Sequence, residues 1–338
     1  MVASFPVPGA FRGSDVFLRS SPEGFPRSAR QPGDGGHGLV ELLLGGVPAL
    51  AHGGRDAVFE VVLQQGHGHR LEGAGDGGDL GHDVDAVLVL LHHAGDPARL
   101  PSIRDGRAGA QDEGSQLAAL IAASAPLEGD NDERWLDLCA GPGGKAALLA
   151  GLAAGVGARV TANEVHPHRA RLVERTTRQF DSIEVVSGDG RTFGGGQSAW
   201  RLGSFDRVVV DAPCSGMGSM RRRPESRWNR TPADVEELTV LQRELLDRAV
   251  ALTRPGGVLT YITCSPHAAE TREQVERLLK AGDVELLDTV ALANECAPEA
   301  LDVPASAGVI ARHKGRTLQL WDHRFGTDLM FVACLRKR

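Results

Sequence analysis

The sequence predicts an α/β fold in which helices cover both faces of a doubly wound parallel sheet. From residue 131 onward, short apolar stretches rich in β-branched residues alternate with longer amphipathic stretches. This alternation is typical of parallel strands joined by helical crossovers. A second observation agrees with it, because successive strand-like stretches end in glycine, acidic or cysteine residues. Such sheets bind ligands at the carboxyl ends of their strands, so a functional site is expected there.

The expected elements follow one another along the chain. A short strand near residues 106–110, a turn and an amphipathic helix from about Ser115 come first. Strands are then expected at 134–139, 158–164, 183–189, 205–211 and 256–265, and helices at 143–154, 166–180, 231–253 and 267–281. The helix at 231–253 opens with a threonine cap and a proline at the first helical position, which is a common helix start. Residues 284–288 and 329–337 are candidate closing strands.

The first part of the chain has a different composition. Residues 1–100 hold 19 of the 43 glycines and 7 of the 12 histidines, and they contain no lysine. Because so much glycine weakens both helix and strand, we expect a poorly specified segment at 1–94. It is either a small or disordered appendage, or a stretch preceding the true start of the coding region, and the second interpretation is favoured. The histidines lack an ordered set of companion ligands, so no metal site is predicted from them.

Cysteine usage and hydropathy indicate a cytoplasmic protein. The chain has five cysteines, an odd number without close regular spacing, which argues against a disulfide framework and for reduced thiols. It has no run of about 18 apolar residues and no N-terminal signal pattern, so neither a membrane span nor secretion is expected. The net charge of −7 does not indicate a nucleic-acid binder, but the stretch Arg221 to Arg230 is locally basic.

A glycine-rich turn follows the first strand of the repeating part, in the stretch DLCAGPGGK from Asp137 to Lys145. It lacks the spacing and the Ser/Thr of a phosphate-binding P-loop. Glu164 ends the next strand, where an acid would bind ribose hydroxyls, and Asp189 ends the third, where an acid would accept a hydrogen bond from adenine. This pattern suits NAD and S-adenosylmethionine equally well.

Two cysteines follow neighbouring strands, Cys214 in DAPCSG and Cys264 in TCS. Zinc would need more ligands than these two, with His267 the one further candidate, and neither thiol belongs to a CxxC redox motif. Covalent catalysis remains: a thiolate that adds to carbon 6 of cytosine makes carbon 5 nucleophilic, and a second thiol assists the departure of the first. Cys139 is interpreted as structural, and Cys296 and Cys334 as incidental or core residues.

The motifs resemble one family. Four stretches of the chain are LDLCAGPGGKAALLA, ANEVHPHRARLV, FDRVVVDAPCSGMGSMRRRPESRW and GGVLTYITCSPHAAET. They closely resemble the RsmB/Sun (Nol/Nop/Sun) family of RNA cytosine carbon-5 methyltransferases, in its bacterial 16S rRNA branch. QDEGSQL and the ending LQLWDHRFGTDLMFVACLRKR are also similar. The resemblance covers roughly Gly95 to Arg338. It implies a Rossmann-like class I methyltransferase fold, with a catalytic domain at 131–338, a lead-in strand and helix at 95–130, and the uncertain segment at 1–94.

The resemblance also assigns roles by position. It implies that S-adenosylmethionine lies against Cys139, Ala140, Gly141, Pro142, Gly143, Gly144, Lys145, Glu164, Asp189 and Asp211. Cys264 would be the nucleophile and Cys214 would assist product release, with Asp211 and Lys145 close to the target base. Arg169 would either support the cofactor site or lie on a solvated helix face. The RNA-binding side chains would be Arg221, Arg222, Arg223 and Arg227.

The implied partner is RNA, with 16S ribosomal RNA expected, and the implied protein is a monomer with no metal or membrane partner. Residues 1–94 do not resemble the NusB-like domain that usually precedes the catalytic part in this branch, which leaves RNA affinity open. A DNA cytosine-5 methyltransferase would use Cys214 as nucleophile, but the TCS motif and the missing Glu-Asn-Val element disfavour it. A catalytically silent RNA-binding relative would not need every chemical position filled, and an NAD oxidoreductase would leave both cysteines unexplained.

Overall fold

The computed structural model describes residues 109–195, 200–228, 230–297 and 300–338, together with residue 103 and six short strands nearer the N-terminus. The chain divides into two compact units, and residues 112–338 all fall in one of them. The N-terminal strands pair antiparallel as β1 with β2, β3 with β4 and β5 with β6. Their bounds are Ala3–Phe5, Val16–Leu18, Leu39–Val40, Ala49–Leu50, Val58–Gln65 and Ala86–His93. The rest of the 1–94 segment lies outside the described residues, so its two interpretations remain predictions.

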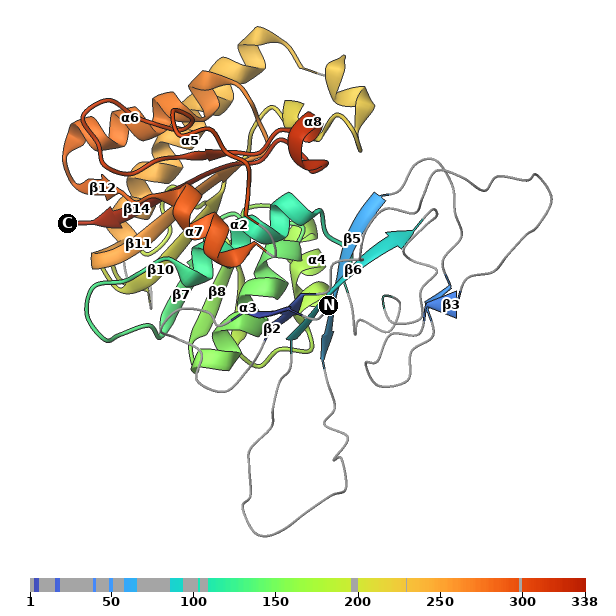
Figure 1. Ribbon diagram of the computed structural model, residues 1–338. Coiled ribbons are helices and arrows are strands. Elements are labelled where there is room, and N and C mark those ends of the chain that lie inside the picture. The colour runs from blue at the N-terminus through green and yellow to red at the C-terminus, as the bar shows by residue number, and fades with distance from the viewer. Residues whose placement is uncertain are drawn as a thin grey trace. The chain divides into compact units, whose positions relative to one another are not determined.

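The second unit is built on an eight-stranded sheet (Figure 1). Its strands are β7 (Arg134–Asp137), β8 (Arg159–Glu164), β9 (Ile183–Ser187), β10 (Phe205–Asp211), β11 (Thr253–Thr263), β12 (Val284–Leu286), β13 (Leu318–Gln319) and β14 (Phe331–Lys337). The order across the sheet is β12-β14-β11-β10-β7-β8-β9, with β13 paired to β14. The strands from β9 to β11 run parallel to one another, which confirms the predicted fold class.

One edge departs from the parallel sheet that the sequence predicts. The crossover from β11 through a helix reaches β12 but leaves a gap between these strands, and β14 fills it antiparallel to both. The direction reverses because β14 is reached through a long connection over residues 287–330 that enters the sheet from the other end. The sheet is therefore mixed at this edge.

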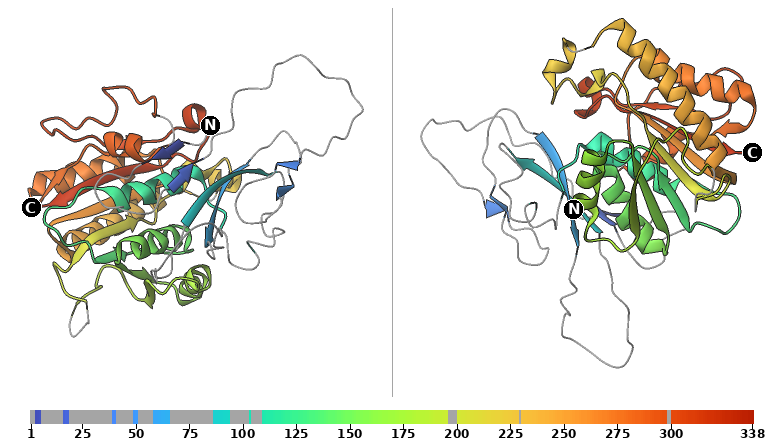
Figure 2. Two further views of the ribbon diagram at one scale, coloured as in Figure 1. Left: turned by 60° about the horizontal axis from the view of Figure 1, so that its bottom comes forward. Right: turned by 180° about the vertical axis from the view of Figure 1, so that it is seen from behind.

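Helices cover both faces of the sheet (Figure 2). They are α2 (Glu113–Ser124), α3 (Gly144–Val156), α4 (Pro167–Thr177), α5 (Pro232–Leu252), α6 (Arg272–Ala281), α7 (Thr289–Cys296) and α8 (Asp322–Phe325). Helix α2 packs against α3 and α7, and α5 packs against α6. No helix in the described part of the chain is long and apolar enough to cross a membrane.

Two helix starts differ from the sequence prediction. Helix α2 begins at Glu113 rather than Ser115, because Asp112 caps it by accepting a hydrogen bond from the Ser115 N–H. The lead-in strand expected before it has no counterpart at residues 109–112, and its earlier residues lie outside the description. The helix expected over 267–281 is divided, since a short 3₁₀ turn, η4 (Ala268–Glu270), precedes α6.

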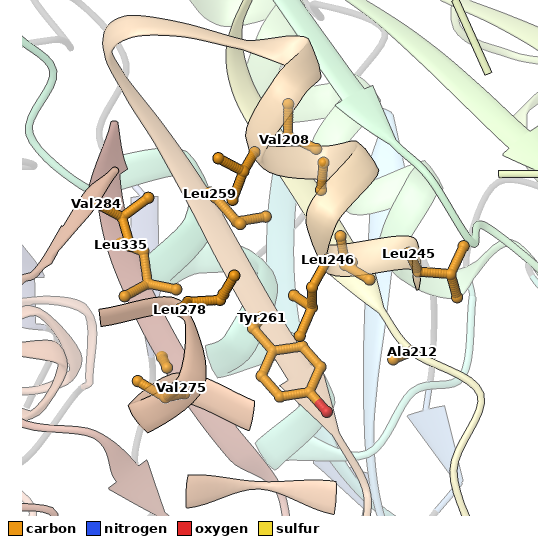
Figure 3. Packing of buried hydrophobic residues seen from close by; sticks show 14 of the residues in the cluster. Val208, Ala212, Leu245, Leu246, Leu259, Tyr261, Val275, Leu278, Val284 and Leu335 are labelled. Atoms are coloured by element: carbon orange, nitrogen blue, oxygen red, sulfur yellow. The ribbon is translucent and has the colours of Figure 1, made fainter. Parts of the chain in front are cut away.

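The core lies where α5 and α6 cover the strands β10 and β11 (Figure 3). Tyr261, Leu246 and Leu259 are essentially inaccessible to solvent. Since both faces of these central strands are covered, β10 and β11 are buried along nearly their whole length rather than at alternate positions. The rigid centre of the sheet therefore lies directly behind the loops that follow these two strands.

The chain reverses its direction across the sheet between β7 and β10. After β9 it crosses back to β10 on the other side of β7, so β7 and β10 form the topological switch point. Ligands of doubly wound sheets bind at the carboxyl ends of the strands there. Asp137 and Asp211 end these two strands.

Removing core volume from β11 should destabilise the whole unit. Leu259→Ala deletes a side chain that is 1% exposed, and should lower the free energy of unfolding by about 2–5 kcal/mol in urea titrations. The matched control is Leu202→Ala, at a side chain that is 53% exposed, which should change stability by less than about 0.5 kcal/mol. Equal effects of the two substitutions would contradict this assignment of the core.

Candidate active site

The structure brings the two motif cysteines together. Asp211 at the end of β10 pairs with Ile262 on the parallel strand β11, so the loops after the two strands leave the sheet side by side. The sulfur atoms of Cys214 and Cys264 lie 3.4 Å apart, within hydrogen-bonding distance. Both are free thiols, and neither is fully exposed. This geometry supports the prediction that they act on one substrate, although their individual roles remain predictions.

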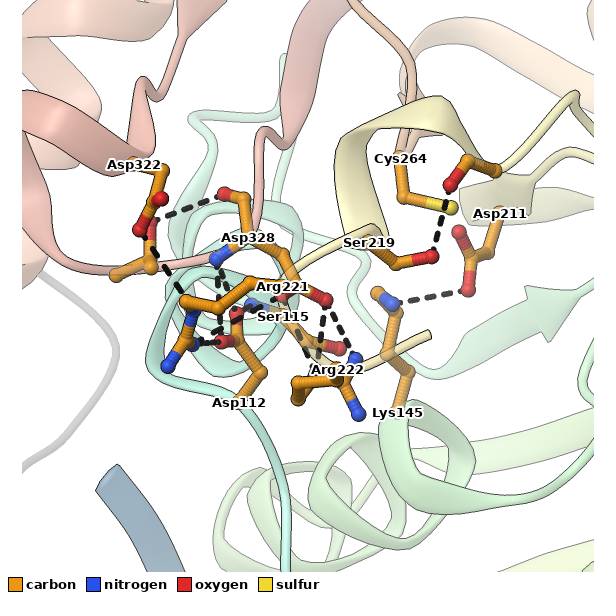
Figure 4. Close-up of polar contacts among 12 residues, drawn as sticks. Asp112, Ser115, Lys145, Asp211, Ser219, Arg221, Arg222, Cys264, Asp322 and Asp328 are labelled. Carbon is orange, nitrogen blue, oxygen red and sulfur yellow. Dashed lines mark hydrogen bonds and ion pairs between the residues drawn. The ribbon is translucent and has the colours of Figure 1, made fainter. Parts of the chain in front are cut away.

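An ion pair lies beside Cys264 (Figure 4). The Lys145 ammonium, on the first turn of α3, is 2.9 Å from Asp211 Oδ2 at the end of β10. Lys145 is 11% exposed and Asp211 is 29% exposed, so the pair lies at the wall of the site. Burial opposes the charge on Lys145, but Asp211 raises its pKa above the ordinary value, so the lysine stays protonated.

The two thiols have different electrostatic surroundings. A hydrogen bond from Cys214 lowers the pKa of Cys264. Burial and the negative charge of Asp211 oppose this shift, and the positive charge of Lys145 adds to it. The same hydrogen bond raises the pKa of Cys214, as do burial and the negative charge of Glu270. Cys264 is therefore the thiol favoured as a thiolate, and Cys214 the one that keeps its proton.

His267, the one further candidate for a zinc ligand, is engaged elsewhere. His267 Nδ1 accepts a hydrogen bond from the Ala269 N–H at the start of η4. Among the residues that the structure describes, no group of three or more His, Cys, Asp or Glu side chains is arranged to hold a metal ion. Cys334 is fully buried on β14, and burial raises its pKa to about 12, which agrees with its interpretation as a core residue.

The glycine turn is held by Glu164 and Arg169. Glu164 is 3% exposed and accepts hydrogen bonds from the N–H groups of Gly141 and His166. Arg169 donates to the Gly141 carbonyl at 2.6 Å and lies 3.5 Å from Glu164 Oε2. A Cβ at position 141 would collide with the Glu164 carboxylate, so only glycine fits there. Of the two interpretations of Arg169, the structure supports the one that places it at the loop.

Asp137 belongs to the site and was missed by sequence reasoning. It is fully buried at the end of β7, and burial together with the charge of Asp211 raises its pKa to about 7. Its Oδ1 accepts from the Cys139 N–H, but its Oδ2 has no protein partner. The available signal in the sequence was an acidic residue at the end of the first buried strand, directly before the glycine-rich turn.

The loop region fits a polar cofactor. Besides Asp137 Oδ2, the buried Asn163 Oδ1 near the end of β8 lacks a partner, while its amide nitrogen donates to the carbonyls of Leu138 and Gly188. Buried polar atoms are nearly always hydrogen-bonded in native proteins, so two unpaired oxygens next to the glycine turn are consistent with a bound polar group. Asp189, which is predicted to accept a hydrogen bond from adenine, is more exposed than Asp137 and Asn163 and forms an ion pair with Arg191 at 2.6 Å.

The arginines predicted to bind RNA are partly engaged within the protein (Figure 4). Arg221 lies 3.0 Å from the buried Asp112, and Arg222 lies 2.5 Å from the buried Asp328. These pairs fix the loop after β10 while leaving 41% of the Arg222 side chain exposed. Arg223 is exposed, and the side chain of Arg227 lies outside the description. RNA contact by these residues stays a prediction.

The sheet has the Rossmann-like doubly wound order with a glycine turn after its first strand, which is the fold of class I S-adenosylmethionine-dependent methyltransferases. Residues 124–336 match the family model described as 16S rRNA methyltransferase RsmB/F, and the chain belongs to this family. The predicted family, fold class and cofactor are thereby confirmed.

Known relatives cover the same part of the chain. The chain is 54% identical over 243 residues to a methyltransferase of Mycobacterium tuberculosis, covering 72% of this chain and 49% of that protein. It is 40% identical over 235 residues to ribosomal RNA small subunit methyltransferase B of Sodalis glossinidius, covering 67% and 52% of the two chains. The chain thus spans about half the length of these relatives.

Solved structures share the fold. The crystal structure of PH0851 is 25% identical, with a TM-score of 0.61 and coverage of 74% of this chain and 52% of that one. NSun6 from Pyrococcus horikoshii is 22% identical, with a TM-score of 0.58 and coverage of 76% and 60%.

Asp137 gives the protein a pH-dependent stability. Its folded pKa of about 7 lies above the ordinary 3.8, so between these values the native state holds a proton that the unfolded chain has released. The free energy of unfolding should therefore fall as the pH rises through this window, by up to about 4 kcal/mol. Asp137→Asn should flatten this part of the profile and be more stable than the parent chain at high pH in urea titrations.

The control for this prediction is Asp181→Asn, at an exposed carboxylate. It should leave the shape of the pH profile unchanged. If Asp137→Asn kept the parent profile between these two pKa values, the protonation assigned to Asp137 would be wrong.

Proposed function

We propose that this chain transfers a methyl group from S-adenosylmethionine to carbon 5 of a cytosine in RNA, with 16S ribosomal RNA as the expected substrate, through a covalent bond between Cys264 and the base. The observation that carries the proposal is the pair of sulfur atoms 3.4 Å apart beside the Lys145–Asp211 ion pair. Membership of an rRNA methyltransferase family supports the RNA substrate.

The first step uses Cys264 as the nucleophile. Its thiolate adds to carbon 6 of the cytosine, the π electrons of the 5,6 double bond shift toward carbon 4, and those of the carbon 4–N3 bond move onto N3, so carbon 5 becomes the nucleophilic carbon of an enamine. The proposed role of Lys145, whose ammonium acts on Cys264, is to stabilise the negative charge that develops on the ring. S-adenosylmethionine would supply the electrophilic methyl group to carbon 5, with S-adenosylhomocysteine as the leaving group, and the residues expected to hold it are those of the glycine turn together with Glu164, Asp189 and Asp211.

The second step releases the product. A base removes the proton from carbon 5, the 5,6 double bond re-forms, and the bond between Cys264 and carbon 6 breaks with its electron pair on sulfur. Cys214 keeps its proton in this environment and lies within hydrogen-bonding distance of the departing sulfur. Its hydrogen bond stabilises the thiolate as it leaves, which gives the two cysteines successive roles.

Charge distinguishes this assignment from that of a DNA cytosine methyltransferase, in which Cys214 would be the nucleophile. The pKa of Cys264 is lowered, because the hydrogen bond from Cys214 together with the charge of Lys145 outweighs burial and the charges of Asp211 and Asp328. The pKa of Cys214 is raised by the same hydrogen bond, by burial and by Glu270, so Cys264 is the better candidate for the thiolate. Reaching carbon 6 also requires an unstacked cytosine, so a loop or single-stranded target is expected.

Cys264→Ala should abolish methylation. The substitution removes the only atom proposed to bond to the base, so the initial rate with labelled S-adenosylmethionine and ribosomal RNA should fall by at least about a thousandfold. Cys296→Ala is the matched control and should retain normal activity, because the sulfur of Cys296 is hydrogen-bonded to the Ser124 hydroxyl outside the site. Normal turnover in Cys264→Ala would exclude the covalent mechanism proposed for this residue.

Cys214→Ala should instead trap the reaction after bond formation. Without the thiol that assists departure, a covalent protein–RNA adduct should accumulate and appear as a slower band in denaturing gels. The double variant Cys214→Ala with Cys264→Ala should form no adduct. An adduct in Cys264→Ala but not in Cys214→Ala would show that the two roles are reversed.

A further inference from the structure

A buried carboxylate lies between the two cysteine loops. Glu270, on the short turn η4, has no solvent-accessible surface. Its Oε1 accepts from the Ser215 N–H at 2.7 Å and from Gln242 Nε2 at 3.3 Å. Its Oε2 accepts from the hydroxyls of Ser215 and Ser265, each at 2.6 Å. The four donors satisfy a carboxylate that would otherwise be costly to bury.

Three of the four donors belong to the two segments that carry the thiols. Ser215 directly follows Cys214 in the loop after β10, and Ser265 directly follows Cys264 in the loop after β11. The two serine hydroxyls converge on one oxygen atom of Glu270 and lie 3.4 Å from each other. The Glu270 side chain therefore connects the two loops beyond the ends of their strands, in addition to the backbone hydrogen bond from the Gly218 N–H to the Cys264 carbonyl at 2.9 Å.

The turn that carries Glu270 is held in place from behind. The hydroxyl of Tyr261, a fully buried residue of β11, donates to the Glu270 carbonyl at 2.6 Å. Gln242 on α5 also donates to the Pro213 carbonyl at 2.8 Å, and Gln274 on α6 donates to the Ala269 carbonyl at 2.9 Å. Glu270 is thus anchored to the core through three elements, which leaves little freedom to the loops it connects.

We infer that Glu270 is a positioning residue that sets the distance between Cys214 and Cys264 by binding both neighbouring serines. It does not bond to the thiols and takes no part in bond making. The catalytic meaning of the inference rests on the proposed function, since it concerns the same pair of sulfurs. The geometric part stands independently, because it concerns only how far apart the thiols are held.

The distance between the sulfurs controls the reactivity of Cys264. The charged and titratable groups that act on its thiol are Cys214, Asp211, Lys145, Asp328 and Arg222. Of these groups, only Cys214 directly precedes a residue that Glu270 binds, namely Ser215. The ion pairs Lys145–Asp211 and Arg222–Asp328 form without Glu270. If the two loops separate, the hydrogen bond from Cys214 is lost while the other influences remain.

The test measures thiol reactivity rather than methylation. The full chain is alkylated with iodoacetamide over a range of pH, and the rate at each cysteine is followed by mass spectrometry of tryptic peptides, in which Cys214 and Cys264 fall on different peptides. Iodoacetamide reacts with the thiolate, so the pH profile reports the apparent pKa of each thiol. Neither RNA nor cofactor is needed, so failure of this test is distinct from failure of the proposed function.

Two variants and one control decide the result. Glu270→Gln keeps the shape but leaves one acceptor oxygen for four donors, and should lower the alkylation rate of Cys264 at pH 7 about tenfold, with its profile moved to higher pH. Ser265→Ala removes a single hydroxyl and should act in the same direction by about threefold. Asp206→Asn is the control. This buried carboxylate lies at the opposite end of β10 and accepts hydrogen bonds from the backbone N–H groups of Glu133 and Arg134 and from the Arg254 guanidinium, so its loss should leave the pH profile of Cys264 unchanged.

A merely structural role would lower the stability of Glu270→Gln and Asp206→Asn alike without moving the thiol profile. If neither Glu270→Gln nor Ser265→Ala alters the Cys264 profile relative to Asp206→Asn, the inference is overturned. Should Glu270→Gln fail to fold, Ser265→Ala alone decides, because it keeps the other three donors to the carboxylate.

Discussion

The charge state of the site depends on one cation. Lys145 is nearly buried and hydrogen-bonded to Asp211, and both Asp137 and Cys264 act on it. One ammonium in a poorly solvated environment cannot fully balance two carboxylates and a thiolate, so the pKa of the more buried acid rises. That acid is Asp137, which holds its proton below its pKa of about 7. When Asp137 is neutral, the positive charge of Lys145 acts on Asp211 and on the sulfur of Cys264.

Strand register turns chain order into this arrangement. Because Asp211 is matched with Ile262 in the parallel pair, Cys214 and Cys264 lie three and two residues beyond a matched position. The strand pairing brings the thiols to one edge of the sheet, but its hydrogen bonds do not extend along the loops that follow the strands. The hydrogen bonds of Glu270 to Ser215 and Ser265 hold these loops, so the site combines a rigid strand pair with a buried polar connection.

The sequence predicts those parts of the fold and site that depend on local pattern. The alternation of strand-like and helix-like stretches predicts the parallel strands. Because the glycine turn and the two cysteines follow the ends of such strands, the sequence also predicts that they lie at one edge of the sheet. Long-range pairing is not visible in this way: Asp112 and Arg221 are 109 residues apart, and Asp328 and Arg222 are 106 apart. Glu270 reads as an ordinary acid of a solvated helix, and only the folded chain reveals its burial. The reversed β14 is missed because apolar pattern carries no strand direction.

Asp112 determines where the compact unit that carries the site can begin. It caps α2, accepts from the Asp328 N–H and pairs with Arg221, so a residue that precedes the sheet completes the support beneath the loop that follows β10. The boundary of this compact unit therefore lies before Asp112 and not at Arg134, where the first strand of the sheet begins. A truncation or domain fusion would keep the support of the loop after β10 only if its boundary fell upstream of that aspartate.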